Sequence, residues 1–279
     1  MSTPAPPVRP AAGRSAGQLL SSVWVLTVRN LLHIAREPMR LSDATIQPVV
    51  FTLLFVYVFG AGVVLADGAS YEDFAVAGLL ALNLTTGTVG TAVGLSEDLG
   101  TGVIDRFRAL PLWRPAIIVA RSLADLLTAV ICAFFVVLTG LLVGWRPDAD
   151  VGSVVAAFAI FLLFSYAISW VSACIGVLSR DPESSQGIGL IVLFPLAIVS
   201  NAMVPTENMP ALLRTLADWN PVSAVTAAAR DLLGNPNPSA AVDAWPMQHP
   251  VLASLLWSVA LIGVFAPVAT AIYRRRTTD

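Results

Sequence analysis

Long apolar runs dominate the pattern of hydrophobic and polar positions along this chain. A helix needs about 20 mostly apolar residues to cross the hydrocarbon core of a bilayer. Six runs are of roughly that length, and they occupy residues 46–66, 74–95, 116–145, 151–178, 186–204 and 251–273. Lipid offers backbone groups no hydrogen-bond partner, so spans of this composition are expected to be helical. The pattern predicts an all-α integral membrane protein with a six-span transmembrane domain over residues 46–273.

A polar segment, residues 96–121, separates the second run from the third. Lipid provides no partner for its charges, so the segment is expected at a membrane face. Asp98 is suited to cap a helix there, because its carboxylate can accept hydrogen bonds from free backbone N–H groups and favours the positive end of the helix dipole. Pro111 is suited to end that helix. The segment therefore predicts a short helix over residues 98–111.

This predicted helix carries both charge and an apolar edge. Its later turns contain Arg106 and Arg108, which match the negative end of the helix dipole. The apolar edge is formed at helical spacing by Ile104, Phe107 and Leu110. An ordinary loop would leave these apolar side chains uncovered, so we expect a protein partner on this surface.

The residues before the first span divide into two parts. Residues 1–16 are rich in proline, alanine and serine and predict a disordered cytoplasmic tail. Residues 17–37 show helical periodicity but too short an apolar part to cross a bilayer, which favours an amphipathic helix in the interface. A signal peptide is the competing interpretation. It is disfavoured because Arg29 and Arg36 follow the apolar part and no clear small-residue cleavage site is present.

The segment between the fifth and sixth runs is too long to be a turn. Residues 209–233 contain two amphipathic stretches separated by Asn220 and Pro221, which predicts a pair of short helices. Neither is long enough to cross a bilayer, so both are expected to lie on or dip into the outer leaflet. The charged residues expected to stay hydrated there are Arg214, Asp218, Arg230 and Asp231.

The placement of positive charge predicts the orientation. All sixteen basic residues are arginine. With the amino terminus inside the cell, every arginine except Arg146, Arg214 and Arg230 falls on an inner segment. Because positive residues favour the cytoplasmic side, both termini are expected in the cytoplasm, with residues 274–279 as a second tail.

Composition excludes several kinds of function. The chain is 56% hydrophobic and 12% charged, with a mean hydropathy of +0.77, whereas about a quarter of the residues in a soluble domain are charged. It has no lysine and therefore no Walker-type phosphate loop. We expect no enzyme activity in this chain. Cys132 and Cys174 lie in apolar runs and are interpreted as small buried hydrophobes, with no metal site.

Polar residues inside the predicted spans are few. Those chosen as candidates for a substrate pathway are Asn83, Thr86, Ser165, Tyr166, Ser169 and Trp170. The alternative is that they form hydrogen bonds between helices. Gly90 and Gly94 form a GxxxG pair, which favours close helix packing within or between subunits.

Arg121 and Asp125 form a charge cluster near the inner end of the third run. They are four residues apart on one helix face and can pair with one another or with Glu97. A structural pair is the favoured interpretation, because a charge left unpaired there would be strongly destabilising. The alternative is that the cluster transmits motion of the polar segment to the spans.

Two motifs carry a resemblance to a known family. They are EDLGTGVIDRFRALP, residues 97–111, and NMP-x3-R-x5-NP-x8-RDLL, residues 208–233. With these motifs in these places, the chain resembles the type-2 ABC exporter permeases of the daunorubicin-resistance kind over nearly its whole length. The resemblance implies that residues 98–111 form a coupling helix seated in an ATPase, and that residues 209–233 are a re-entrant helix pair lining the exit.

The resemblance also implies the partners. It implies two copies of a separate ABC ATPase subunit, which would hold ATP and Mg²⁺, and a second permease copy, either identical or related. Carried over by position, the residues that couple to the ATPase are Glu97, Gly102, Arg106, Arg108 and Pro111. The same predicted helix adds Asp98, Ile104, Asp105 and Phe107 to the coupling candidates.

We therefore expect an ATP-driven exporter of a hydrophobic or amphiphilic drug- or antibiotic-like compound in a bacterial plasma membrane, with no nucleic-acid partner. One open alternative is an exporter of a cell-envelope lipid or glycopolymer. A second is a membrane anchor or immunity subunit that transports nothing. A proton-driven carrier is disfavoured, because no ionisable residue lies near the centre of any predicted span.

Overall fold

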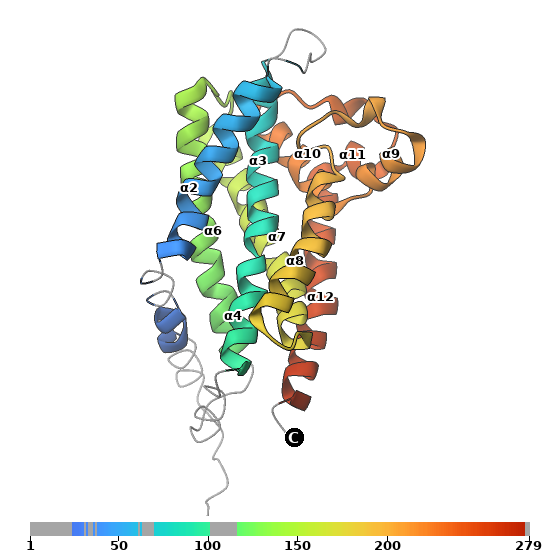
Figure 1. The fold of residues 1–279 in the computed structure, drawn as a ribbon. Coiled ribbons are helices and arrows are strands. Elements are labelled where there is room, and N and C mark those ends of the chain that lie inside the picture. The colour runs from blue at the N-terminus through green and yellow to red at the C-terminus, as the bar shows by residue number, and fades with distance from the viewer. Residues whose placement is uncertain are drawn as a thin grey trace, which may run out of the picture.

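The computed structural model describes residues 24–30, 32, 36, 38–60, 62, 70–100 and 116–276, and in these ranges the regular elements are helices (Figure 1). The longer ones are α2 (Pro38–Leu54), α3 (Tyr71–Gly87), α4 (Val89–Gly100), α6 (Ala116–Val143), α7 (Val151–Leu178), α8 (Pro182–Ile198), α10 (Pro221–Leu233) and α12 (Pro250–Arg276). The shorter ones are η1 (Phe55–Phe59), η3 (Thr206–Asn208), α9 (Ala211–Asp218), η4 (Pro238–Ala241) and α11 (Trp245–Gln248). The predicted all-α class is confirmed for this part of the chain.

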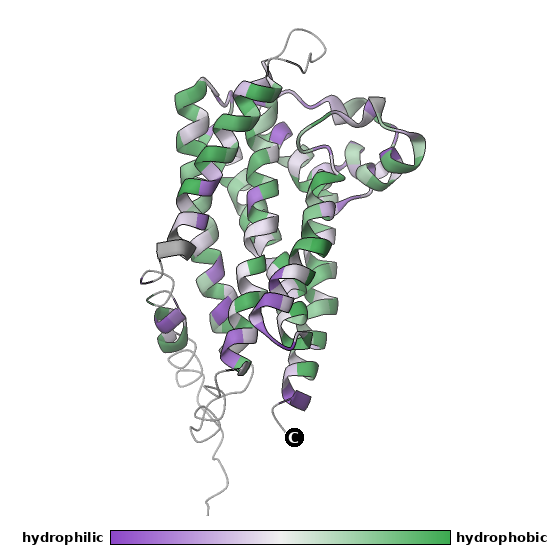
Figure 2. Cartoon of the chain, viewed as in Figure 1, coloured by the Kyte–Doolittle hydropathy of each residue, from purple (hydrophilic) through white to green (hydrophobic). Residues whose placement is uncertain are grey.

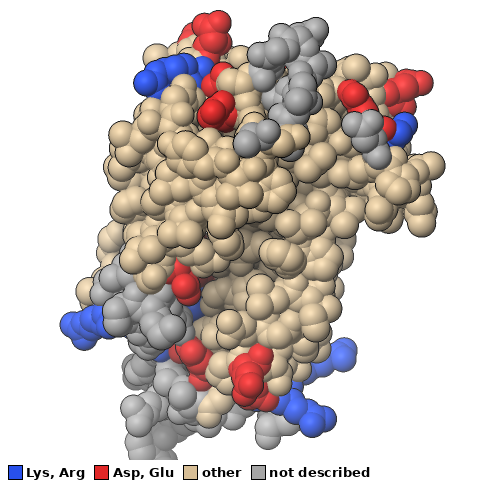
Figure 3. All heavy atoms as spheres, turned by 45° about the horizontal axis from the view of Figure 1, so that its top comes forward, with Lys and Arg blue, Asp and Glu red and all other residues tan. Residues whose placement is uncertain are grey.

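Within the described residues, five stretches of helix are long and apolar enough to cross a bilayer, judged by length and composition. They are Ser42–Phe59, Tyr71–Gly100, Val119–Val143, Val151–Leu178 and Pro250–Arg276. Figure 2 shows apolar residues along the whole bundle. Figure 3 shows charged side chains gathered mainly toward its two ends, with a broad uncharged belt between them. This is the architecture of a multi-pass membrane protein.

The helix in the fifth predicted run differs from the prediction of 186–204. Asp181 caps α8 by accepting a hydrogen bond from the Ser184 amide at 2.8 Å, so the helix begins earlier than predicted. It has 17 residues, a length of about 25 Å, because it stops at Ile198. The chain then turns, and the Asn201 side chain donates to the Ser239 hydroxyl at 2.7 Å. The six-span layout therefore stays a prediction.

Helices α3 and α4 form one long span at the centre of the bundle. α3 packs against α6, α8 and α10, and α4 packs against α7 and α8. Two of these approaches require glycine. A Cβ at Gly78 would lie 1.8 Å from the carbonyl oxygen of Ala202, and a Cβ at Gly176 of α7 would lie 2.4 Å from that of Ala92.

The central span is interrupted at Thr88. The Thr88 amide donates to the carbonyl of Thr85 at 3.3 Å, three residues back, so the regular ladder of bonds to the fourth residue is broken there. The Thr88 hydroxyl donates to the same carbonyl at 2.7 Å, and the Ser172 hydroxyl of α7 donates to Thr88 at 2.9 Å. The interruption is thus fixed by local polar contacts.

Two short helices, α9 and α10, occupy the segment for which a helix pair is predicted. They are divided at Asn220, whose side chain caps α10 by accepting from the Val222 amide at 2.8 Å. α10 ends at Gly234, which has a φ of +68° and leaves no room for a Cβ beside the carbonyl of Asp148. The position of these helices relative to the outer leaflet stays a prediction.

The expectation that all four charges of this segment are hydrated is wrong for two of them. Arg214 and Asp231 are exposed, but Asp218 is 5% exposed and Arg230 is fully buried. Asp218 accepts a hydrogen bond from the Thr206 hydroxyl at 3.0 Å. The error arises because the face of α10 that carries Arg230 packs against α3, a contact that local periodicity does not predict.

The Arg230 guanidinium is held by backbone carbonyls. It donates to the carbonyl of Phe74 from Nε and Nη2 at 3.1 Å each, to Asn201 at 3.0 Å and to Ala202 at 2.9 Å. It also lies 3.7 Å from the centroid of the Phe74 ring. Burial lowers the pKa of Arg230 to about 9, which still leaves the group charged at neutral pH. The side chain thereby ties α10 to the start of α3 and to the turn after α8.

Replacing Arg230 with methionine should destabilise the protein strongly. Arg230→Met removes four hydrogen bonds and leaves three carbonyls without this donor, so we expect a loss of about 3 kcal/mol or more. The measurement is the apparent Tm of the purified protein in detergent. The control is Arg214→Met on exposed α9, for which a change within about 0.5 kcal/mol is expected. Equal Tm values for the two variants would contradict the anchoring role.

Candidate functional site

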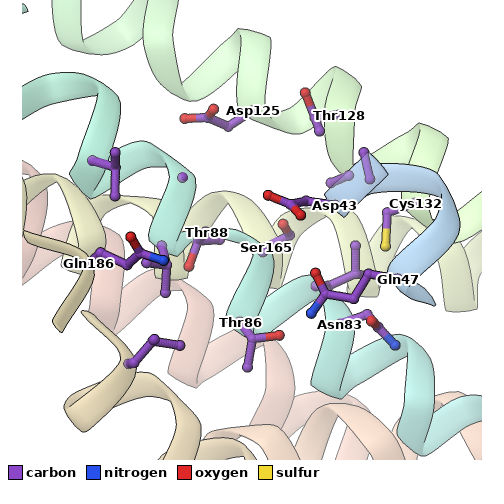
Figure 4. A pocket seen from close by; sticks show the side chains of 18 of the residues that line it. Asp43, Gln47, Asn83, Thr86, Thr88, Asp125, Thr128, Cys132, Ser165 and Gln186 are labelled. Atoms are coloured by element: carbon purple, nitrogen blue, oxygen red, sulfur yellow. The ribbon is translucent and has the colours of Figure 1, made fainter. Parts of the chain in front are cut away.

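A cavity of about 440 Å³ lies between α2, α3, α4, α6, α7 and α8. Figure 4 shows side chains from separate helices facing this space. The polar and charged residues on its wall are Asp43, Gln47, Asn83, Thr86, Thr88, Arg121, Asp125, Thr128, Ser165 and Gln186. The volume falls within the range of about 300–1,000 Å³ typical of small-molecule sites.

The backbone interruption at Thr88 forms part of the cavity wall, together with Gly87 and Gly90. An unbroken apolar helix would present only side chains to the cavity. Here the two glycines expose main chain, and the chain changes from α3 to α4 beside the polar groups of α6. The cavity therefore combines an apolar surround with a limited number of polar groups, as in sites for amphiphilic ligands.

Several of the polar side chains use their donors within their own helix. The Asn83 amide donates to the Leu79 carbonyl at 2.8 Å, the Thr86 hydroxyl to Leu82 at 2.9 Å, and the Thr128 hydroxyl to Ala124 at 3.1 Å. Hydroxyl and amide oxygens can still accept hydrogen bonds after donating in this way. These three residues thus contribute mainly acceptors to the cavity.

The structure brings Arg121 and Asp125 together on α6. Their Nε and Oδ1 atoms lie 3.6 Å apart, and the Thr91 hydroxyl of α4 donates to Asp125 at 2.6 Å. Arg121 also donates from Nη2 to the Gly90 carbonyl at 3.0 Å. The cluster therefore ties α6 to α4. Glu97 takes part in other interactions near the end of α4.

Within this chain, the GxxxG pair accommodates a side chain and not a helix backbone. A Cβ at Gly94 would lie 1.8 Å from Nη2 of Arg121, whereas a Cβ at Gly90 would meet no atom within 4 Å. Gly94 thus leaves the space that the Arg121 guanidinium fills. The nearest backbone contact of α4 is made elsewhere, between Ala92 and Gly176.

The six predicted pathway residues separate into two groups. Asn83, Thr86 and Ser165 line the cavity. The other three pack inside the bundle: Ser169 donates to the Tyr166 carbonyl at 2.8 Å, and the Tyr166 and Trp170 rings meet edge to face at 6.1 Å. Trp170 belongs to a separate apolar cluster with Leu95, Cys174 and Tyr273. The hydrogen bond of Ser169 and the ring contact of Tyr166 with Trp170 both lie within α7, so a pathway role for these three residues stays a prediction.

Two of the predicted coupling residues lie in the last turns of α4. Asp98 accepts a hydrogen bond from Arg29 at 2.9 Å, and α4 continues past it to Gly100, so the predicted cap at Asp98 stays a prediction. Glu97 precedes it in the same turn. The other predicted coupling residues lie outside the described residues: Gly102, Ile104, Asp105, Arg106, Phe107, Arg108 and Pro111.

The amino-terminal helical residues 24–30 pack beside the two helices that flank this segment. Leu26 is 5% exposed and belongs to the cluster that includes Leu95 of α4 and Ala120 of α6. The Thr27 hydroxyl donates to the Ala120 carbonyl at 3.4 Å. Together with the ion pair between Arg29 and Asp98, these contacts join three separate parts of the chain.

The polar residues of the cavity that were not among the candidates chosen from the sequence are Asp43, Gln47, Thr88, Thr128 and Gln186. Asp43 and Gln47 lie four residues apart on α2, the first before the predicted start of the first span at residue 46 and the second just inside it. Their i, i+4 spacing on one helix face was a signal that they share a surface. Gln186 marks the polar start of the fifth run, and only the packing of α8 on α4 reveals what it faces.

Comparison with known proteins identifies the family. Residues 21–233 match the family described as ABC-2 type transporter, and the chain belongs to that family. It is thus a membrane component of an ABC transporter, which is a permease and not a catalytic subunit. The family resemblance indicated by the two sequence motifs is confirmed.

Several curated relatives are permeases. The chain is 33% identical to the daunorubicin resistance ABC transporter permease protein DrrB1 of Streptomyces coeruleorubidus, over 96% of this chain and 90% of that protein. It is 23% identical to the probable doxorubicin resistance ABC transporter permease protein DrrC of Mycobacterium tuberculosis, over 98% and 96% of the two chains. It is 24% identical to the putative transport permease ycf38 of Porphyra purpurea, over 78% and 76%.

A substitution at Gly94 tests the space occupied by Arg121. Gly94→Ala places a methyl group where the guanidinium lies, so Arg121 loses its position beside Gly90 and Asp125, and we expect a loss of about 1–2 kcal/mol. The matched control is Gly90→Ala in the same helix, which meets open space and should be neutral or stabilising by up to about 1 kcal/mol. Apparent Tm measures both. Destabilisation of similar size in the two variants would rule out the specific contact.

Proposed function

We propose that this chain is the permease subunit of an ATP-driven exporter and that a hydrophobic or amphiphilic drug-like compound passes through the cavity. The observation that carries the proposal is a cavity of about 440 Å³ with a partly polar wall inside an otherwise apolar bundle. Relatives named for daunorubicin and doxorubicin resistance support this class of cargo. The mixed wall suits a compound with an apolar body and a few polar groups.

Membership of the ABC-2 type family supports a separate ATPase subunit as the source of energy for transport. In this proposal two ABC ATPase subunits bind ATP and Mg²⁺ and pair with two permease copies, identical or related. Residues 98–111 form the coupling helix between the ATPase and helices α4 and α6. The packing of residues 24–30 against those two helices supports this role, because it makes their ends move together.

The proposed membrane arrangement keeps six spans. α8 is the fifth span, and its short length of about 25 Å fits a bilayer that is locally thinned or a helix that is shielded by α3 and α4. Both termini lie in the cytoplasm of a bacterial cell, and α9 and α10 form a re-entrant pair on the outer side. The triple arginine at the end of α12 supports this orientation.

Filling the cavity should stop export. Thr86→Phe places a ring in the cavity, and we expect at least a fivefold fall in ATP-dependent daunorubicin uptake by inside-out vesicles that contain the permease and its ABC ATPase. The control is Val151→Phe at the exposed start of α7, away from the cavity wall, which should leave uptake unchanged. Uptake by the wild-type complex must also require a hydrolysis-competent ATPase.

Three results would contradict the proposal. Absence of ATP-dependent daunorubicin uptake together with translocation of a fluorescent phospholipid would point to export of an envelope lipid. Absence of any stimulation of the ATPase by the permease would point to an anchor or immunity subunit. Full uptake by Thr86→Phe would place the route outside this cavity.

The ion pair between Arg29 and Asp98 offers a test of coupling. Arg29→Asp and Asp98→Arg each place two like charges in contact, so each should lower drug-stimulated ATPase activity of the whole complex several-fold. The double variant restores an opposite-charge pair and should recover at least half of the wild-type activity. Recovery no better than that of the single variants would mean that the pair itself does not matter for coupling.

A further inference from the structure

We propose that the cavity selects amphiphilic cations and that Asp43 binds their protonated amine. The inference rests on the proposed export function and narrows its cargo. Asp43 lies on α2 and faces the cavity in Figure 4. Its side chain is exposed, and none of the described side chains forms a hydrogen bond or ion pair with it. Asp43 is the second residue of the candidate span Ser42–Phe59, and a carboxylate that faces a cavity at the end of a span without such a partner indicates a functional site.

The charge balance of the cavity is negative. Among the described residues that line it, two are carboxylates, Asp43 and Asp125, and one is a guanidinium, Arg121. Arg121 is already engaged by Asp125 at 3.6 Å and by the Gly90 carbonyl at 3.0 Å, in the space that Gly94 leaves. Because the cation is committed to Asp125 and to the backbone, it does not neutralise Asp43. The cavity therefore favours a ligand that brings its own positive charge.

Several uncharged polar groups on the cavity wall also favour a positively charged ligand. The side chains of Asn83, Thr86 and Thr128 each donate a hydrogen bond to a carbonyl of their own helix, at 2.8, 2.9 and 3.1 Å. Thr86 and Thr128 have thereby used their single donor and present oxygen lone pairs to a ligand, and Asn83 presents its amide oxygen beside its second N–H. An ammonium group has several N–H donors and no acceptor, so it matches such a wall. An anionic ligand would meet acceptors and a free carboxylate and would be disfavoured.

The apolar part of the wall suits the rest of an amphiphile. Leu84, Val89, Val93, Ala129 and Leu190 line the same cavity and offer surface for an aromatic or alicyclic body. The ligand class that fits is thus a compact apolar body with a protonated amine. Asp43 would distinguish it from a neutral molecule of the same shape.

A matched pair of probes tests the inference by equilibrium binding to the full-length permease in lipid nanodiscs. Daunorubicin carries one protonated amine at neutral pH, and its N-acetyl derivative has nearly the same shape without the charge. Fluorescence anisotropy should show that the wild type prefers the cation by about tenfold or more, as expected for loss of one charge-assisted hydrogen bond. Asp43→Asn should abolish this preference by weakening daunorubicin binding alone.

Two further variants separate a specific role from general effects. Asp43→Glu keeps the charge and should keep the preference. Glu183→Gln removes an exposed carboxylate near the start of α8 that does not line the cavity, and it should also keep the preference. Apparent Tm values confirm that each variant is folded. Retained preference in Asp43→Asn, or lost preference in Glu183→Gln, would overturn the assignment of Asp43.

The vesicle assay with the complete complex distinguishes failure of this inference from failure of the proposed function. Export of daunorubicin and its N-acetyl derivative at equal rates, with equal affinities in nanodiscs, would overturn cation selection and leave drug export standing. Export of neither probe would overturn both. Export that prefers daunorubicin in the wild type, and not in Asp43→Asn, is the result that we expect.

Discussion

Backbone carbonyl groups inside an apolar bundle need hydrogen-bond donors, and in this protein arginine side chains supply many of them. Arg146 donates at 2.7 Å to the carbonyls of Leu141 in the last turn of α6 and of Trp145 just after it. Arg276 donates to the carbonyls at the end of α7, at 2.8 and 3.3 Å. Arg230 donates to the Phe74 carbonyl at the start of α3, and Arg121 donates to the Gly90 carbonyl beside the interruption at Thr88. A guanidinium has five N–H donors in a fixed plane and can serve several carbonyls at once, which an ammonium on a flexible stem does less well. This requirement gives a physical reason for a chain whose basic residues are all arginine.

The same requirement determines the polarity of the cavity. Each hydroxyl or guanidinium that satisfies a carbonyl loses donors that a ligand could otherwise use. Thr86 and Thr128 donate to their own helices and Arg121 donates to Gly90, so the two hydroxyls offer a ligand oxygen lone pairs only. The chemistry offered to a ligand is therefore what remains after the bundle has satisfied its own backbone, with Asp43 as the strongest remaining acceptor.

The length of apolar runs predicted the positions of most spans, because the thickness of a bilayer constrains helix length directly. Contacts between distant parts of the chain could not be predicted in the same way. Arg230 looked like a hydrated charge on an amphipathic helix, yet it binds a carbonyl 156 residues away. Ser165 and Ser169 lie one turn apart on α7, and only the neighbouring helices decide that the first faces the cavity and the second is packed. Asp43 was overlooked because it lies before the predicted start of the first span.

Helix α4 connects the proposed coupling segment to the cavity. This helix has 12 residues and is about 18 Å long, with Asp98 near one end and the interruption at Thr88 just before the other. Arg121 fixes α4 to α6, and Arg29 contacts its Asp98 end, so a force on that end would move α4 as a rigid body. α3 is held at its opposite end by Arg230, whose bonds to the Phe74 carbonyl resist such movement. Displacement would therefore be taken up at Thr88, where the ladder of helical hydrogen bonds is already broken and where the wall of the cavity lies.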